Sequence, residues 1–303
     1  MGRRADRAGA VAVALASLLA FVLVAGAALA GCGSSEPPPP SRFDANRTWR
    51  LVELQVAAGQ RPAGSPQLRR LASRLRPLLP DGRFEAIPGE PGLRNIVGTL
   101  PGVGPAIVLG AHYDTLTKPR GFIGANNGAA GTAVVIEAGR ALGRMRAEPR
   151  AREVRFVLFD GEEPPVGLPR ESKDFYNEGL RGSRAYVAAH RGETSAMILL
   201  DYVGHRGLWL PREATSTEWL WRQLRGAADA VGVEGVFSEE AGPGIVDDHS
   251  PFLRAGVPAV DLIDWRYPGQ SLADGLDKIS PRSLDAVGET VVQLISELRM
   301  SLD

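Results

Sequence analysis

Side chains that can bind a metal ion or transfer a proton recur in this sequence directly after short apolar runs. His112 and Asp114 follow the apolar run 107–111 and stand two residues apart, so on an extended chain both point to the same side. A carboxylate placed in this way can orient a histidine ring that binds a metal. Taken alone, the pair is equally compatible with a histidine in an ordinary turn at the end of a strand.

Two adjacent glutamates, Glu162 and Glu163, come after the apolar run 154–158. Neighbouring carboxylates raise each other's pKa unless a cation lies between them. One carboxylate can therefore bind a metal while the other acts as a general base. The alternative interpretation is a solvated loop.

Further acidic residues follow two more apolar runs. Asp201 closes the run 197–200, and Asp248 and His249 precede the run 257–263. The complete set of candidate ligands and bases is His112, Glu162, Glu163, Asp201, Asp248 and His249. Such a set favours Zn²⁺ or another divalent cation used in hydrolysis or in polarising a carbonyl group.

The elements that must position these residues alternate between short apolar runs and helical stretches. Strands are predicted at 95–100, 106–111, 154–159, 197–200 and 258–263. Helices are predicted at 49–54 and 68–78 and near 128–146, 180–190, 216–231 and 281–299. This alternation favours a single α/β domain with a mostly parallel, mixed central sheet flanked by helices. Functional groups in such domains collect just past the carboxyl ends of the strands, where these clusters lie.

Composition excludes some classes of protein. Hydrophobic residues make up 44% of the 303 residues and charged residues 23%, which is ordinary for a globular domain. The formal net charge is zero, so no nucleic-acid partner is expected. The chain has a single cysteine, so neither disulfide bonds nor cysteine-bound metals are expected.

The N-terminal segment has the pattern of an export signal. Basic residues at positions 3, 4 and 7 precede an apolar run over 8–30, and Leu-Ala-Gly then leads into Cys32. This ending resembles a bacterial lipobox, which implies acylation of Cys32; an uncleaved transmembrane anchor is the alternative. The predicted organisation is a signal peptide at 1–31, a lipidated cysteine and proline-rich tether at 32–42, and a folded domain at 43–303. The protein is therefore expected on the extracytoplasmic face of the cell membrane, anchored by lipid.

The order of motifs along the folded domain resembles a known family. The motifs are HYDT, GANNGAAG, FDGEE, GSRAY, LLDYVG, DDHSPFLRAGVP and DKISPRSL. Together they are similar to those of the zinc aminopeptidases and the animal-type glutaminyl-peptide cyclotransferases, over roughly residues 45–300, and the DDHSPFL element leans toward the cyclotransferases. The resemblance implies a zinc-exopeptidase-like fold, zinc as cofactor, and peptide or protein N-termini as partners.

The resemblance also implies a role for each matching residue. The metal ligands would be His112, Glu163 and Asp201. The catalytic residues would be Glu162 as general base or acid/base, Asp114 as the orienting partner of His112, and Asp248 in a proton relay.

Two positions depart from the family pattern. Asn127 stands where the family has a bridging aspartate, and Gln270, counted back from Asp277, stands where the family has a metal-binding histidine. The neighbouring Gly269 replaces a tryptophan. A neutral amide is a far poorer zinc ligand than a carboxylate or an imidazole. The sequence therefore predicts that the ordinary metal site is not fully built.

Three functions are compatible with these features. The retained carboxylates slightly favour a zinc aminopeptidase or glutaminyl cyclase with reduced or lost activity, because acidic side chains around an empty site would repel one another. The substitutions at Asn127 and Gln270 favour a metal-free pseudoenzyme that binds peptide or another ligand in the same cleft. A docking module on a lipid anchor has no positive feature in its favour.

Overall fold

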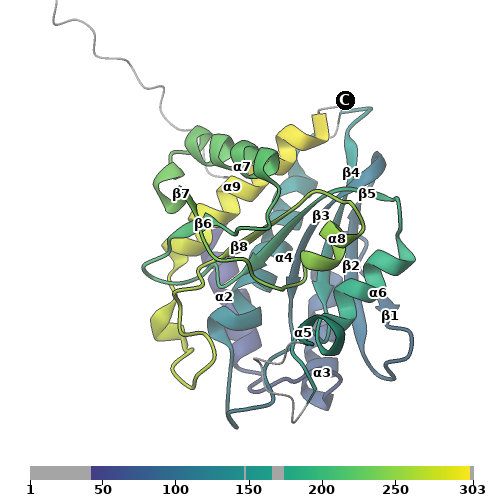
Figure 1. Ribbon diagram of the computed structural model, residues 1–303, viewed down its shortest axis with the longest axis vertical. Coiled ribbons are helices and arrows are strands. Elements are labelled where there is room, and N and C mark those ends of the chain that lie inside the picture. Colours follow the sequence, from purple (N-terminus) through teal and green to yellow (C-terminus); the bar gives the residue numbers. More distant parts are fainter. Residues whose placement is uncertain (1–41, 147, 166–173, 301–303) are drawn as a thin grey trace, which may run out of the picture. The chain divides into compact units, whose positions relative to one another are not determined.

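The structure of the chain is a computed structural model that describes residues 42–146, 148–165 and 174–300 (Figure 1). The predicted signal peptide, Cys32 and all of the predicted tether except Arg42 lie outside the described residues. Among the residues that are described, no helix is long and apolar enough to cross a membrane.

A six-stranded mixed sheet forms the centre of the domain. Its strands are β1 (Arg83–Ala86), β2 (Arg94–Leu100), β3 (Val103–His112), β4 (Arg152–Phe159), β5 (Thr194–Asp201) and β8 (Ala259–Ile263). They lie in the order β1-β2-β4-β3-β5-β8. The strands β4, β3, β5 and β8 are parallel, whereas β2 pairs antiparallel with both β1 and β4. The predicted mixed, mostly parallel sheet is confirmed.

Helices cover both faces of this sheet (Figure 1). They are α2 (Ala45–Val56), α3 (Pro66–Leu75), α4 (Gly131–Arg144), α5 (Phe175–Glu178), α6 (Arg181–Ala189), α7 (Glu218–Ala230), α8 (Ser250–Arg254) and α9 (Pro281–Met300). Helices α4 and α9 pack on one face together with α2 and α7, and α6 and α8 pack on the other. Side chains of β3 alternate accordingly: Leu109 belongs to the larger core under α4 and α9, whereas Val108 packs with Phe252 of α8.

Three short strands were not predicted from the sequence. Strand β1 has four half-buried or exposed residues at the sheet edge and a single large apolar side chain, Phe84. Strands β6 (Leu210–Arg212) and β7 (Phe237–Ala241) form a separate parallel pair. Elements of this length carry too little apolar periodicity to be recognised, because their pairing depends on segments distant in the sequence.

The segment before α4 departs from the helix predicted near 128–146. Residues Ala125–Ala130 form a distorted turn in which Asn127 (φ −75°, ψ 103°) and Gly128 (φ 84°, ψ −39°) leave the helical conformation. The backbone of Gly128 lies against the end of β3, where an added Cβ atom would stand 2.7 Å from the carbonyl oxygen of Asp114. Both the positive φ and this close approach require glycine. The turn thereby brings Asn127 to the end of the sheet.

The substitution Gly128→Ala should lower the free energy of unfolding by about 2–4 kcal/mol, because it combines a left-handed backbone with a steric clash. Urea unfolding followed by circular dichroism measures this loss. The matched control is Gly226→Ala on the exposed side of α7, where nothing lies within 4 Å of the added Cβ atom. This control should stabilise the protein by about 0.5–1 kcal/mol. Equal effects of the two substitutions would contradict the account of the turn.

Candidate functional site

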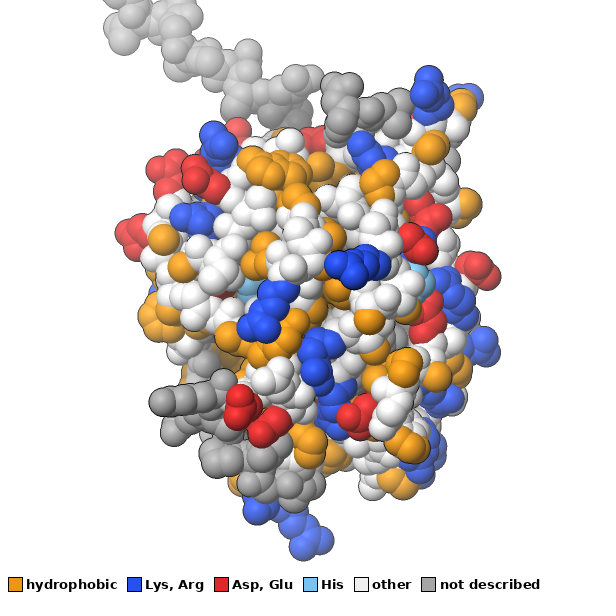
Figure 2. All heavy atoms as spheres, turned by 45° about the vertical axis from the view of Figure 1, so that its right-hand side comes forward, with side chains coloured by type: hydrophobic (Ala, Val, Ile, Leu, Met, Phe, Trp, Pro, Cys, Tyr) orange, Lys and Arg blue, Asp and Glu red, His pale blue; other side chains and the backbone are white. Residues whose placement is uncertain are grey.

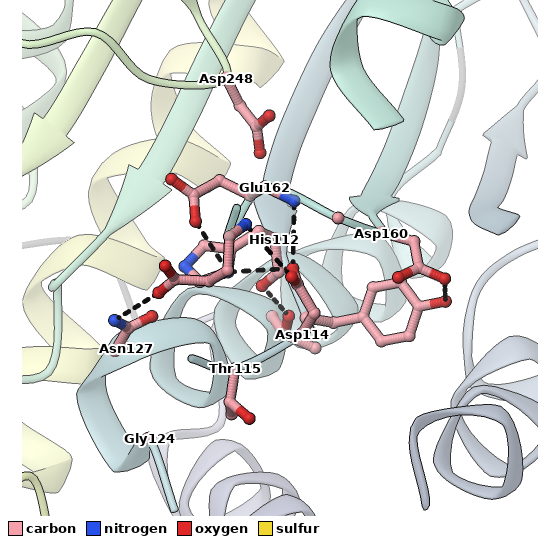
Figure 3. A network of polar contacts seen from close by, with 12 residues as sticks. His112, Asp114, Thr115, Gly124, Asn127, Asp160, Glu162 and Asp248 are labelled. Carbon is pink, nitrogen blue, oxygen red and sulfur yellow. Dashed lines mark hydrogen bonds and ion pairs between the residues drawn. The ribbon is translucent and has the colours of Figure 1, made fainter. Parts of the chain in front are cut away.

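The parallel strands β3, β4 and β5 end side by side and bring together residues from three of the predicted clusters. His112 ends β3, Glu162 follows β4, and Asp201 ends β5. The Nε2 atom of His112 lies 3.5 Å from Asp201 Oδ1, and its Nδ1 atom lies 3.8 Å from Glu162 Oε2 (Figure 3). All three side chains are nearly buried, with at most 6% of each residue exposed.

Asp114 lies beneath this group and is completely buried. Its Oδ1 atom is 3.5 Å from His112 Nδ1 and accepts a hydrogen bond from the backbone N–H of Glu162 at 3.3 Å. Its Oδ2 atom accepts from the backbone N–H of Glu163 at 3.2 Å. Asp114 therefore ties the turn after β4 to the end of β3, beside the ring that the sequence predicted it to orient.

Asn127, labelled in Figure 3, contacts the side chain of Glu163. Its Nδ2 group donates to Glu163 Oε1 at 3.0 Å, and it lies 3.3 Å from the Tyr202 hydroxyl and 3.4 Å from the carbonyl oxygen of Gly269. Its own backbone N–H donates to Asp274 Oδ2 at 3.0 Å. Asn127 is thus at the centre of a hydrogen-bonded network rather than on a free loop.

The described residues do not fit the zinc ion that the resemblance implies. Within residues 42–146, 148–165 and 174–300, no group of three or more His, Cys, Asp or Glu side chains could hold a metal ion. One carboxylate oxygen of Glu163 already accepts a hydrogen bond from the Asn127 amide. Gln270 supplies an exposed neutral amide where a histidine would be needed.

A cleft of about 330 Å³ opens above the strand ends. Three carboxylates, those of Glu162, Asp201 and Asp247, line it. The remaining lining residues are mostly apolar or aromatic: Phe175, Tyr202, Ile245, Val246, Ile263, Trp265, Tyr267 and Gln270. The cleft therefore combines an acidic group with apolar walls, and most of the apolar walls come from residues that the sequence analysis did not single out.

The two adjacent aspartates before α8 have different surroundings. Asp247 lines the cleft, whereas Asp248 is completely buried and accepts a 2.5 Å hydrogen bond from the hydroxyl of Ser183. The family resemblance implied a proton-relay role for Asp248, and Asp247 was not predicted as a site residue. No sequence signal distinguishes neighbouring acidic residues in a loop, because the turn of the backbone decides which one faces the cleft.

His249 is not among the residues that line the cleft. It is completely buried, with Nε2 3.0 Å from the Thr215 hydroxyl and 3.3 Å from Glu213 Oε2. Glu213 also accepts a hydrogen bond from the backbone N–H of Ile245 at 2.9 Å. Although burial raises its pKa, the bonds from His249, Thr215 and Ile245 lower the pKa of Glu213 to about 2. The ionised carboxylate therefore holds the loop that carries Asp247.

Burial and mutual repulsion shift the titration of the acidic group. Burial raises the pKa of Glu162 well above its ordinary value, and Glu163 raises it further. Burial and the nearby Asp201 raise the pKa of Asp247 to about 6. Burial lowers the pKa of His112, but the facing carboxylates, with Glu162 first, outweigh burial and raise that pKa well above its ordinary value. The facing carboxylates therefore favour the protonated form of the ring.

Comparison with known proteins gives one family match and several relatives. Residues 95–295 match the family described as Peptidase family M28. Aminopeptidase YwaD of Bacillus subtilis is 26% identical over 209 residues, which are 63% of this chain and 40% of that protein. The glutaminyl-peptide cyclotransferase of Bos taurus is 25% identical over 244 residues, which are 67% of this chain and 65% of that protein.

A solved structure extends this similarity to the fold. The crystal structure of an Acidobacteriales bacterium glutaminyl cyclase matches with a TM-score of 0.72 and 27% identity. The match covers 88% of this chain and 97% of that one. The resemblance seen in the order of the motifs, and the zinc-exopeptidase-like fold that it implied, are confirmed.

Proposed function

Because the chain belongs to Peptidase family M28, we propose that its cleft binds the amino-terminal residue of peptides and holds the α-ammonium group with Glu162, Asp201 and Asp247. The observation that carries this proposal is the opening of three carboxylates into one cleft. One relative is named an aminopeptidase and another a glutaminyl-peptide cyclotransferase, which supports a peptide N-terminus as the ligand.

Electrostatics favours a positively charged ligand group at this place. Buried carboxylates that lack a cation cost free energy, and the high pKa values of Glu162 and Asp247 reflect that cost. His112 offsets part of the negative charge through its contacts with Glu162 and Asp201. An ammonium group has three N–H donors and forms charge-assisted hydrogen bonds with carboxylates. A peptide N-terminus would therefore relieve the repulsion that remains.

The walls of the cleft favour an apolar first residue. The volume of about 330 Å³ lies at the lower end of the usual range for ligand sites, which run from about 300 to 1,000 Å³. Ile263, Trp265 and Tyr267 line it together with the carboxylates. The side chain of the first residue can thus pack on an apolar wall while its amine meets the acidic group.

A direct test is calorimetric titration of the full-length chain, purified in detergent, with leucylglycine at pH 7.5. The free dipeptide should bind, and N-acetyl-leucylglycine, which lacks the ammonium group, should bind at least about tenfold more weakly. The variant Asp247→Asn should lose about tenfold in affinity for the free dipeptide, because one charge-assisted hydrogen bond is removed.

The matched control is Glu239→Gln, which removes an acidic group whose side chain is 80% exposed and paired with Arg225. This control should leave the affinity unchanged. Lowering the pH from 7.5 to 5 should weaken binding by about tenfold, because Asp247, with a pKa of about 6, becomes protonated and can no longer attract a cation. Equal affinity for the free and the acetylated dipeptide would refute the proposal.

Turnover by Glu162 is a second candidate function. The side chain of Glu162 lines the cleft, and burial and the neighbouring Glu163 raise its pKa, which favours a group that takes up and releases a proton. Glu162 would take a proton from water, or from the α-amine of an N-terminal glutamine, and give it to the departing amine.

The substitution Glu162→Gln tests this second function. If the chain turns over aminoacyl or N-terminal glutaminyl substrates, the variant should lose at least about 100-fold in rate while its circular dichroism spectrum stays unchanged. Full activity in the variant would show that Glu162 is not the acid/base. No turnover by the original chain would exclude the second function and leave the first intact.

We also propose that acylation of Cys32 anchors the domain to the membrane. The single cysteine of the chain follows an apolar run and Leu-Ala-Gly, as a lipobox requires. In a bacterial host, Cys32→Ser should abolish incorporation of radiolabelled palmitate into the protein. It should also lower the share of the protein that is recovered in the membrane fraction. The control Ser34→Ala should be labelled like the original chain. Continued lipid labelling of Cys32→Ser would contradict the anchor.

A further inference from the structure

We infer that the side-chain amide of Asn127, buried next to this cleft and in contact with Tyr202 of its wall, takes the place of a metal ion, and that Asn127 and Gln270 are the two residues that prevent zinc from binding. This inference rests on the geometry around Asn127 and does not depend on the identity of the peptide ligand. It assigns Asn127 a positioning role: the amide satisfies Glu163, which a cation would otherwise have to satisfy.

The orientation of the Asn127 amide follows from its neighbours. Nδ2 lies 3.0 Å from a carboxylate oxygen of Glu163 and 3.4 Å from the carbonyl oxygen of Gly269, and both of these atoms can only accept hydrogen bonds. The NH₂ group must therefore face them, since the amide oxygen would be repelled. The amide places hydrogen-bond donors next to oxygen atoms that would otherwise require a cation.

The backbone of the turn holds the amide in this position. The backbone N–H groups of Asn126 and Asn127 donate to the two oxygens of Asp274, at 2.8 and 3.0 Å. Asp274 also accepts a 2.6 Å hydrogen bond from the hydroxyl of Tyr267. In addition, the side-chain oxygen of Asn126 accepts from the backbone N–H of Gly204 at 2.7 Å. The turn is thus fastened to the segments that follow both β5 and β8.

Two of the residues that depart from the family pattern, Asn127 and Gly269, contact each other directly and through Tyr202. A Cβ atom at Gly269 would lie only 2.6 Å from the ring of Tyr202, so the absence of a side chain at position 269 makes room for that ring. The hydroxyl of the same ring lies 3.3 Å from the amide of Asn127. Asn127, Gly269 and Tyr202 are far apart in the sequence but form one packed unit. This unit supplies hydrogen bonds where a metal ion would otherwise be needed. The loss of one metal-binding side chain alone would not supply them.

Reversing the two substitutions should reverse this arrangement. With Asn127→Asp, a second carboxylate oxygen would face Glu163 Oε1 at a distance near the present 3.0 Å, and the pair would need a proton or a cation between them. Gln270 lines the cleft together with Tyr202, whose hydroxyl contacts Asn127, so Gln270→His adds an imidazole to that wall. Two carboxylates and one imidazole make a three-ligand set that zinc commonly accepts.

The test measures zinc per chain by mass spectrometry after dialysis of the full-length protein against micromolar zinc. The original chain should hold close to zero zinc per chain, and the double variant Asn127→Asp/Gln270→His should hold close to one. The matched control Asn127→Leu/Gln270→His, which offers the new imidazole without the carboxylate, should also stay near zero. Zinc should raise the melting temperature of the first double variant only.

Two outcomes would overturn the inference. One is stoichiometric zinc in the original chain, which would mean that His112, Glu163 and Asp201, with or without the Asn127 side-chain oxygen, suffice as ligands. The other is a folded double variant with no zinc, which would mean that Asn127 and Gln270 are not what prevents binding. Should the double variant fail to fold, stoichiometric zinc in the original chain would still overturn the inference. Since no peptide is involved, failure here is distinguishable from failure of peptide binding.

Discussion

Buried carboxylates gathered at the end of a parallel sheet must each find a proton, a hydrogen-bond donor or a cation, and this requirement governs the arrangement around the cleft. Asp114 is satisfied by backbone N–H groups of the turn after β4. Glu213 is satisfied by His249 and the backbone of the loop that carries Asp247. Glu163 accepts a hydrogen bond from the side-chain amide of Asn127. The carboxylates that remain open to the cleft are therefore the ones available to a ligand.

The sheet explains why these groups meet, and the sequence was sufficient to predict it. Runs such as 106–111 and 154–159 are apolar and end at polar clusters, so the strands and the gathering of His112, Glu162 and Asp201 could be anticipated. Parallel pairing then brings the carboxyl ends of successive strands to one edge. The apolar runs thus indicate both the strands of the sheet and the edge at which the site lies.

Other features of the site could not be predicted, because they depend on contacts between distant segments. Whether Asp247 or Asp248 faces the cleft is decided by the turn before α8 and by the hydroxyl of Ser183. The relation between Gly269 and the ring of Tyr202 is visible only when the two segments are side by side. The distribution of charge over the surface also depends on the fold. The formal net charge is zero, and Figure 2 shows basic and acidic side chains interspersed over the face in view.

We propose that this acidic cleft recognises a peptide N-terminus without a metal ion. X-ray diffraction from crystals grown with zinc and leucylglycine, recorded at the zinc absorption edge, tests it most directly. We expect the amine nitrogen of the peptide within hydrogen-bonding distance of Glu162, Asp201 or Asp247, and no anomalous peak beside Glu163. An anomalous peak bound by Glu163, or by His112 and Asp201, would contradict it.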